Sequence, residues 1–230
     1  MNAVQIAGCS GAGKSAVAAV LARRGLASLD ADDDPLLARF VDPAGAVVTE
    51  VPAAPDLAWL DRHGWAWDPA RLDALIRAAA PATLYVCGGA DNQPEVAARF
   101  AQVFLLEIDE PTMLARLDAR RDYHSWGRIG DTREYLCRKL PALQDGLRAS
   151  GAVPVDARQP LDQVVEAILA RTLPVRPRAN PAGNPAAPLL AGVEVGAEAA
   201  PVARPSGRAV TAGQSFPTVI LVCRRPKQFG

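Results

Sequence analysis

The chain has 230 residues, half of them hydrophobic, with a formal net charge of zero and a pI near 6.7. This length fits one folded domain with a remainder, and the neutral charge excludes the basic composition typical of nucleic-acid-binding or membrane-surface proteins. No uncharged apolar run approaches the ~20 residues of a spanning helix, and residues 1–8 lack the basic start of a signal peptide. We therefore expect a cytoplasmic protein with no nucleic-acid or membrane partner, whose oligomeric state the composition leaves open.

Strand and helix patterns alternate from residue 1 to about residue 173. Asp68 before Pro69, and Asp109 before Pro111, have the sequence of helix starts. Asp131 and Glu134 have capping-box spacing, and Pro141 predicts a kink or break in the helix that follows. The strands expected are 4–7, 26–29, 83–87, 103–108 and 152–155. Helices are expected over 15–24, from Asp68-Pro69 through Ile76, over 94–101, from Asp109 through Leu117, from Asp131 to about Ser150, and over 160–171. Such alternation predicts an α/β fold with a parallel sheet covered on both faces.

Residues 8–15 read GCSGAGKS and match the phosphate-binding pattern G-x-x-x-x-G-K-[ST]. The glycines permit close backbone approach, and the loop amides with the following helix N-terminus form an anion site. Lys14, one of three lysines among 25 basic residues, provides a compact ammonium for the β- and γ-phosphates. The predicted nucleotide-binding residues here are Gly8, Cys9, Ser10, Gly11, Ala12, Gly13, Lys14, Ser15 and Ala16.

A cluster of aspartates follows the second expected strand, at the sheet edge where α/β proteins bind ligands. Asp30 and Asp32 lie two residues apart and so face the same side of an extended segment. We expect Asp30 to hold Mg²⁺ together with the Ser15 hydroxyl, and Asp32 to orient or deprotonate a phosphoryl acceptor. The alternative is a helix N-cap cluster, which is the better interpretation for Asp33 and Asp34.

Arginines concentrate between residues 114 and 133. Arg116 and Arg120 share one helix face, and such a pair can stabilise the charge of a transferring phosphoryl group. We expect both to contact the nucleotide and Arg120 to be catalytic, with a lid at about 121–131. A solvated basic helix face is the alternative. The other arginines of this segment are Arg121, Arg128 and Arg133.

These motifs together resemble the small P-loop kinases, a group that includes shikimate, gluconate, adenylate and cytidylate kinases. The resemblance covers about residues 1–171 and adds Gly88-Gly89 after the third strand. It implies a three-layer P-loop NTPase fold, with five parallel strands in adenylate-kinase-like order, and ATP with Mg²⁺ as the donor. It also implies that Asp30, Asp32, Gly88 and Gly89 bind the acceptor. The chain departs from the group at Ala16, where many members have threonine, and Gly88 stands where motor-type ATPases have an aspartate.

Two further regions flank this framework. Residues 35–67, the expected acceptor region, contain Phe40, Trp59, Trp65 and Trp67, which could stack on an acceptor or pack locally. Residues 174–230 have nine prolines and eleven alanines and are expected to form a flexible tail.

The predicted function is an ATP-dependent phosphotransferase, a kinase acting on a small metabolite, nucleoside or nucleotide. The alternative is a nucleotide-dependent switch or accessory ATPase that acts on a protein partner.

Overall fold

The computed structural model describes residues 2–120 and 126–172. The chain divides into two compact units, Met1–Arg176 and Pro177–Gly230, and the described residues all belong to the first. The predicted tail 174–230 and the first part of the predicted lid, 121–125, therefore lie outside the described residues, as does Arg121.

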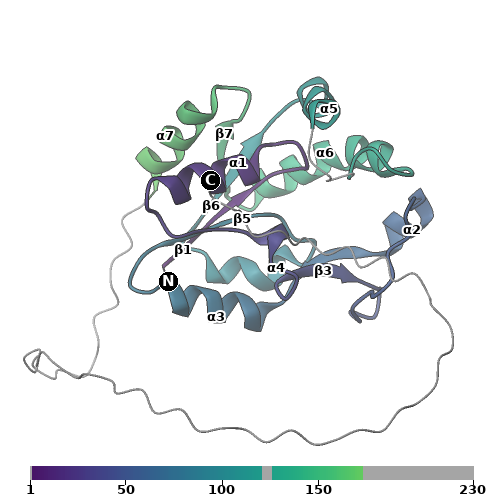
Figure 1. Cartoon of the computed structure of the whole chain (residues 1–230), viewed down its shortest axis with the longest axis horizontal. Coiled ribbons are helices and arrows are strands. Elements are labelled where there is room, and N and C mark those ends of the chain that lie inside the picture. Colours follow the sequence, from purple (N-terminus) through teal and green to yellow (C-terminus); the bar gives the residue numbers. More distant parts are fainter. Residues whose placement is uncertain (1, 121–125, 173–230) are drawn as a thin grey trace, which may run out of the picture. The chain divides into compact units, whose positions relative to one another are not determined.

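A five-stranded parallel sheet forms the centre of the described unit (Figure 1). The strand order is β2-β5-β1-β6-β7, so the first strand lies in the middle with its neighbours reached by crossovers. This confirms the predicted α/β class and the adenylate-kinase-like order, and each expected strand lies within two residues of its observed position. The strands are β1 (Ala3–Ala7), β2 (Ser28–Asp30), β5 (Leu84–Cys87), β6 (Gln102–Glu107) and β7 (Val153–Asp156).

Helices connect these strands largely as the sequence predicts, with several differences. The short helix α2 (Leu57–Arg62) and the 3₁₀ turn η1 (Ala31–Asp33) were not predicted. In place of one helix over 94–101 there is a single turn of α-helix followed by a 3₁₀ turn, η2 (Ala97–Arg99). The predicted break at Pro141 does not occur, because one helix continues through that residue. The helices are α1 (Lys14–Arg23), α2 (Leu57–Arg62), α3 (Pro69–Ala79), α4 (Gln93–Val96), α5 (Glu110–Ala119), α6 (Thr132–Ala149) and α7 (Leu161–Arg171). Among the described residues, no helix has the length and apolar character needed to cross a membrane.

The aspartates at the predicted helix starts behave in two ways. Asp68 accepts from the backbone amides of its own first turn, and Asp109 accepts from Thr112 N at 2.8 Å, so both predicted caps are confirmed. Asp131 does not cap α6 with its side chain. Its carboxylate instead accepts from Leu57 N at 3.1 Å, and its amide donates to Pro55 O at 2.9 Å. The predicted capping box is therefore wrong, because a contact with a distant loop takes that carboxylate.

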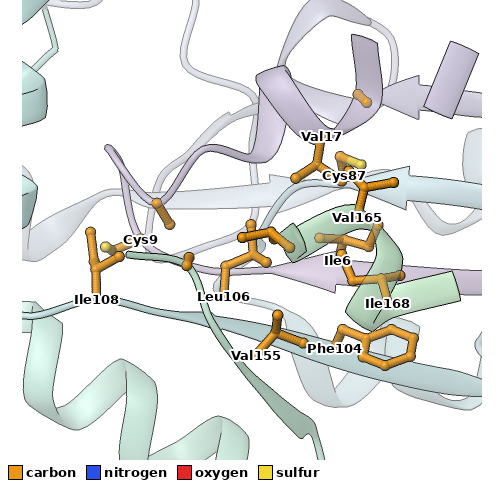
Figure 2. Close-up of a cluster of buried hydrophobic side chains, with 14 of the residues drawn as sticks. Ile6, Cys9, Val17, Cys87, Phe104, Leu106, Ile108, Val155, Val165 and Ile168 are labelled. Carbon is orange, nitrogen blue, oxygen red and sulfur yellow. The ribbon is translucent and has the colours of Figure 1, made fainter. Parts of the chain in front are cut away.

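The two faces of the sheet carry separate hydrophobic cores. Along β1, Ile6 belongs to one core and Ala3 to the other, as the alternation of side chains in a strand requires. The first core joins the sheet to α1 and α7, with Val17 and Val165 facing the strand residues (Figure 2). The second core lies against α3 and α4 and includes the buried Trp67. The sheet is thus covered on both sides, as Figure 1 shows.

An antiparallel hairpin that the sequence analysis did not identify lies within the expected acceptor region. Strand β3 (Ala38–Val41) pairs with β4 (Gly64–Trp67), and Phe40 stands opposite Trp65 in the register. The Phe40 ring meets the rings of Trp59, Trp65 and Trp126 at centroid distances of 5.1, 4.9 and 5.4 Å. Mutual packing of these aromatic side chains, the second of the two interpretations left open by the sequence, is therefore observed.

Candidate functional site

The phosphate-loop sequence forms a compact turn between β1 and α1. Gly13 immediately precedes α1 with φ of 100°, a left-handed conformation that residues with a Cβ rarely adopt. Ala12 N donates to Cys9 O at 3.2 Å and closes the turn. The Lys14 ammonium bends back over the loop and donates to the same carbonyl at 3.1 Å. The fixed residues of the motif thus set both the backbone path and the position of the positive charge.

Asp30 ends β2 beside the start of α1. Burial raises the pKa of its carboxyl, while a hydrogen bond from the Ser15 side chain lowers it, and the nearby Asp32 and Asp33 raise it. The Ser15 side chain is therefore near enough to Asp30 to affect its pKa, and these are the two side chains that the sequence analysis selected for Mg²⁺. A hydroxyl and a carboxylate supply the hard oxygen ligands that Mg²⁺ prefers.

The remaining aspartates after β2 have different surroundings. Asp32 is exposed, and its Oδ1 accepts from the indole Nε1 of Trp65 at 3.1 Å. Asp34 accepts from Leu36 N at 2.9 Å and receives a two-pronged contact from the Arg71 guanidinium, at 2.8 and 3.1 Å. The helix N-cap predicted for Asp34 is therefore wrong, because the amides that it binds belong to a turn before β3. Asp32 remains available at the sheet edge.

The glycine pair follows β5, which lies between β1 and β2 in the sheet. A Cβ at Gly88 would lie 2.6 Å from both the Ala31 Cβ and the Trp67 ring, whereas one at Gly89 would meet only Gly8 O at 3.8 Å. Gly88 is therefore required for packing against the aspartate-bearing turn. Gly89 lies next to the phosphate loop, so the predicted acceptor and phosphate residues converge on one edge of the sheet.

Two arginines, one in α5 and one directly after it, contact the phosphate loop. Arg116 donates to the carbonyls of Gly11 and Ala12, each at 3.3 Å, and to Ala157 O at 2.7 Å. Arg120 donates to Ser10 Oγ at 3.4 Å. Both predicted arginines therefore contact the loop. Arg116 binds backbone carbonyls of the phosphate loop, and through Ala157 it links this loop to the turn after β7.

The last two arginines of the predicted cluster point elsewhere. Arg128 donates to Arg120 O at 3.1 Å, next to the catalytic candidate. Arg133 forms an exposed ion pair with Asp118 at 2.6 Å. The alternative of a solvated basic face therefore describes Arg133 well.

Two supporting features were missed by the sequence analysis. Gln5 lies fully buried in β1, and its amide exchanges hydrogen bonds with that of Gln93, at 2.6 and 3.0 Å, while also reaching Gly88 O at 3.4 Å. Asp91 N donates to Trp65 O, and Asp91 Oδ2 accepts from Trp65 N, both at 2.7 Å. A glutamine inside an apolar strand was the one available signal for the first feature.

The cysteines near the site are poor nucleophiles. Burial raises the pKa of the Cys9 thiol, and it raises that of Cys87 at the end of β5 even further. A thiol is reactive mainly as the thiolate, so neither side chain is suited to covalent chemistry at neutral pH. Cys9, Cys87 and Cys137 are free, and Cys223 lies outside the described residues.

Comparison with known proteins gives matches among solved structures only. No family model matches the chain, and no curated protein does. The structural neighbours are P-loop small-molecule kinases. A sugar kinase from Janibacter sp. HTCC2649 is 19% identical, with 74% of this chain and 93% of that chain covered and a TM-score of 0.43.

Two further neighbours have similar values. For a deoxyadenosine kinase from M. mycoides with bound dATP, the identity is 16%, the coverage 74% and 98%, and the TM-score 0.46. For a shikimate kinase from Acinetobacter baumannii in complex with shikimate, the corresponding values are 17%, 76% and 96%, and 0.44. At such low identities and TM-scores, these likenesses do not extend to the substrate or the chemistry of this chain.

Proposed function

We propose that the protein is a kinase that transfers the γ-phosphoryl group of ATP to a small-molecule acceptor. One observation carries the proposal: the phosphate loop, the Gly88-Gly89 pair and the Asp30–Asp32 segment follow the adjacent parallel strands β1, β5 and β2, and the Asp32 carboxylate is exposed. A nucleotide site and a free carboxylate for an acceptor hydroxyl thus share one edge of the sheet. Phosphoryl transfer needs this combination of positioning and charge more than it needs covalent chemistry.

The residues present fit Mg²⁺ and ATP. The loop amides and the N-terminus of α1 suit phosphate oxygens, and Lys14 adds a positive charge at the same place. Ser15 and Asp30 would hold Mg²⁺, which when bound neutralises charge on the phosphate oxygens. Arg120, which reaches Ser10 of the loop, would stabilise the charge of the group in transfer.

The acceptor would bind between Asp32 and the glycine pair. Asp32 would accept the proton of the attacking hydroxyl, because its carboxylate is exposed and lies beside the nucleotide-binding edge. Gly89 would allow the acceptor to approach the backbone, since the residue has no side chain and lies next to the phosphate loop. The acceptor would be a metabolite, a nucleoside or a nucleotide.

The competing function is a slow ATPase or switch that responds to a protein partner. Its support is the unidentified acceptor and the long C-terminal segment, which lies outside the described residues. Strand β5 ends at Cys87 and is followed by Gly88, so among the described residues no carboxylate directly follows that strand to activate a water molecule. This favours transfer to a bound hydroxyl over hydrolysis.

The test is ATP consumption with Mg²⁺ against adenosine, nucleoside monophosphates, shikimate, gluconate and related polyols. Lys14→Ala should reduce acceptor-dependent turnover by ~100-fold or more, because removing one preorganised charge from a transition state has this order of effect. Lys139→Ala is the matched control, since Lys139 is exposed on α6 and packs over the Tyr135 ring. It should turn over like the wild type.

Two results would argue against the kinase function. One is a slow hydrolysis rate that no acceptor in the panel changes and that a protein partner raises. The other is turnover that survives Lys14→Ala, which would mean that the phosphate loop does not bind the donor. An acceptor that raises turnover only in the wild type and Lys139→Ala would support the proposal and identify the acceptor class.

A further inference from the structure

Among the described residues, Trp65 makes the one hydrogen bond to the Asp32 carboxylate. Its indole Nε1 donates to Asp32 Oδ1 at 3.1 Å, across a sequence separation of 33 residues. Within residues 2–120 and 126–172, Asp32 Oδ2 has no hydrogen-bond partner. One carboxylate oxygen is therefore held by the indole while the other is left for an acceptor.

Three sets of contacts fix the position of Trp65. Its backbone exchanges two 2.7 Å hydrogen bonds with Asp91, on the loop that follows β5. Its ring meets Phe40 edge-on, at a centroid distance of 4.9 Å and an interplanar angle of 65°. Strand pairing with β3 fixes its register, because Trp65 stands opposite Phe40. A side chain fixed in this way has little rotational freedom left to lose, so its N–H can fix the direction of a carboxylate.

The hydrogen bond between Trp65 and Asp32 lies at the edge of the sheet where the predicted site residues converge. Strands β2 and β5 are neighbours in the sheet, and the turns that follow them carry Asp32 and Asp91. Trp65 bonds to both turns, through its indole to the first and through its backbone to the second. It therefore spans the edge at which the phosphate loop and the proposed acceptor site meet.

We propose that Trp65 is a positioning residue for phosphoryl transfer, one that orients the Asp32 carboxylate toward the acceptor hydroxyl through its indole N–H. The inference rests on the proposed kinase function and adds a residue to it. A hydrogen bond to a charged acceptor is stronger than one between neutral groups, and catalytic groups must be held closely to their productive geometry. Trp65 does not touch the reacting atoms, and its effect passes through Asp32.

The experiment is a double-mutant cycle on kcat, with whichever of adenosine, shikimate or gluconate gives the fastest turnover. Trp65→Phe should lower kcat by about tenfold or more while leaving KM for ATP within about twofold, because the donor site is untouched. In an Asp32→Asn background, Trp65→Phe should change kcat by less than about twofold, since the group it orients is already gone.

The matched control is Trp59→Phe. Trp59 packs on the same Phe40 ring and stacks on His63, but its indole nitrogen has no hydrogen bond among the described residues. This variant should leave kcat near the wild-type value in both backgrounds. A second substitution guards against a folding defect: β-(3-benzothienyl)alanine at position 65 keeps the shape of the indole and replaces only the N–H with sulfur. It should reproduce the loss seen with Trp65→Phe.

The outcomes separate the two proposals. If the wild type shows no acceptor-dependent turnover, the kinase function fails and this inference fails with it. If the wild type turns over but the benzothienyl protein is as fast, or if Trp65→Phe costs as much in the Asp32→Asn background as in the wild type, only the role of Trp65 is overturned. Loss in the benzothienyl protein that disappears when Asp32 is replaced supports it.

Discussion

A single methyl group at Gly88 should disturb the site by displacing its neighbours, without removing any charged or hydroxyl group. In Gly88→Ala the new Cβ would lie 2.6 Å from the Ala31 Cβ and 2.6 Å from Cζ2 of Trp67. Ordinary contacts of this kind begin at 3.4 Å, so the neighbours must move by about 0.8 Å. Ala31 is fully buried and Trp67 is 1% exposed, which leaves neither of them free space.

The size of the effect follows from this overpacking. An extra methyl group in a well-packed core costs about 1–3 kcal/mol in the free energy of unfolding. For a chain of this size each kcal/mol lowers the unfolding midpoint by about 2–4 °C, so Gly88→Ala should lose about 2–12 °C. Ala31 lies between Asp30 and Asp32 in the sequence. Its movement should therefore shift both carboxylates and lower kcat as well.

The assay is thermal unfolding followed by circular dichroism, together with turnover at a temperature where both proteins are folded. Gly89→Ala is the matched control, because a Cβ there would meet only Gly8 O, at an ordinary 3.8 Å. Its midpoint should stay within about 2 °C of the wild-type value, within the small effect expected when no clash is introduced. A Gly88→Ala protein as stable as the wild type, beside a Gly89→Ala protein that loses several degrees, would refute the packing argument.

Three other predictions concern the supports of the site. Burial raises the pKa of Asp30, so its negative charge destabilises the folded state at pH values where the carboxyl is ionised. Asp30→Asn should therefore raise the unfolding midpoint of the nucleotide-free and Mg²⁺-free protein at pH 7. This gain should shrink as the pH falls toward ~4, where the wild-type carboxyl becomes protonated. A gain that grows at low pH would contradict this sign. Arg116→Ala should raise KM for ATP by about tenfold, because three backbone carbonyls lose their hydrogen-bond donor. Arg133→Ala is the control: it removes only an exposed ion pair and should leave KM for ATP unchanged. Gln93→Ala should cost about 1–3 kcal/mol in urea unfolding, since it leaves the buried Gln5 amide partly unpaired, and a neutral result would show that the pair is not needed.

The sequence alone determined the framework and the donor side of the candidate site. The motif from Gly8 to Ser15 sets its own backbone path, because glycine conformations and a helix start are local properties. The five strands could be located for a similar reason, since short apolar runs between turn residues are visible in the sequence. The caps at Asp68 and Asp109 were also predictable, as the capping bond of each goes to a backbone amide of its own first turn.

Only the tertiary structure decided which side chains meet across long separations. The same prediction of a cap was wrong at Asp131, because its carboxylate accepts from the backbone amide of Leu57, 74 residues away in the sequence. The Trp65 indole could have packed or bound a ligand, and the fold brings it to Asp32 instead. Gln5 and Gln93 are 88 residues apart and pair because β1 lies beside β5, and α4, which begins at Gln93, follows β5. Local propensity acts within a few residues, whereas these partners are chosen by strand order and loop packing, which no short window of sequence contains.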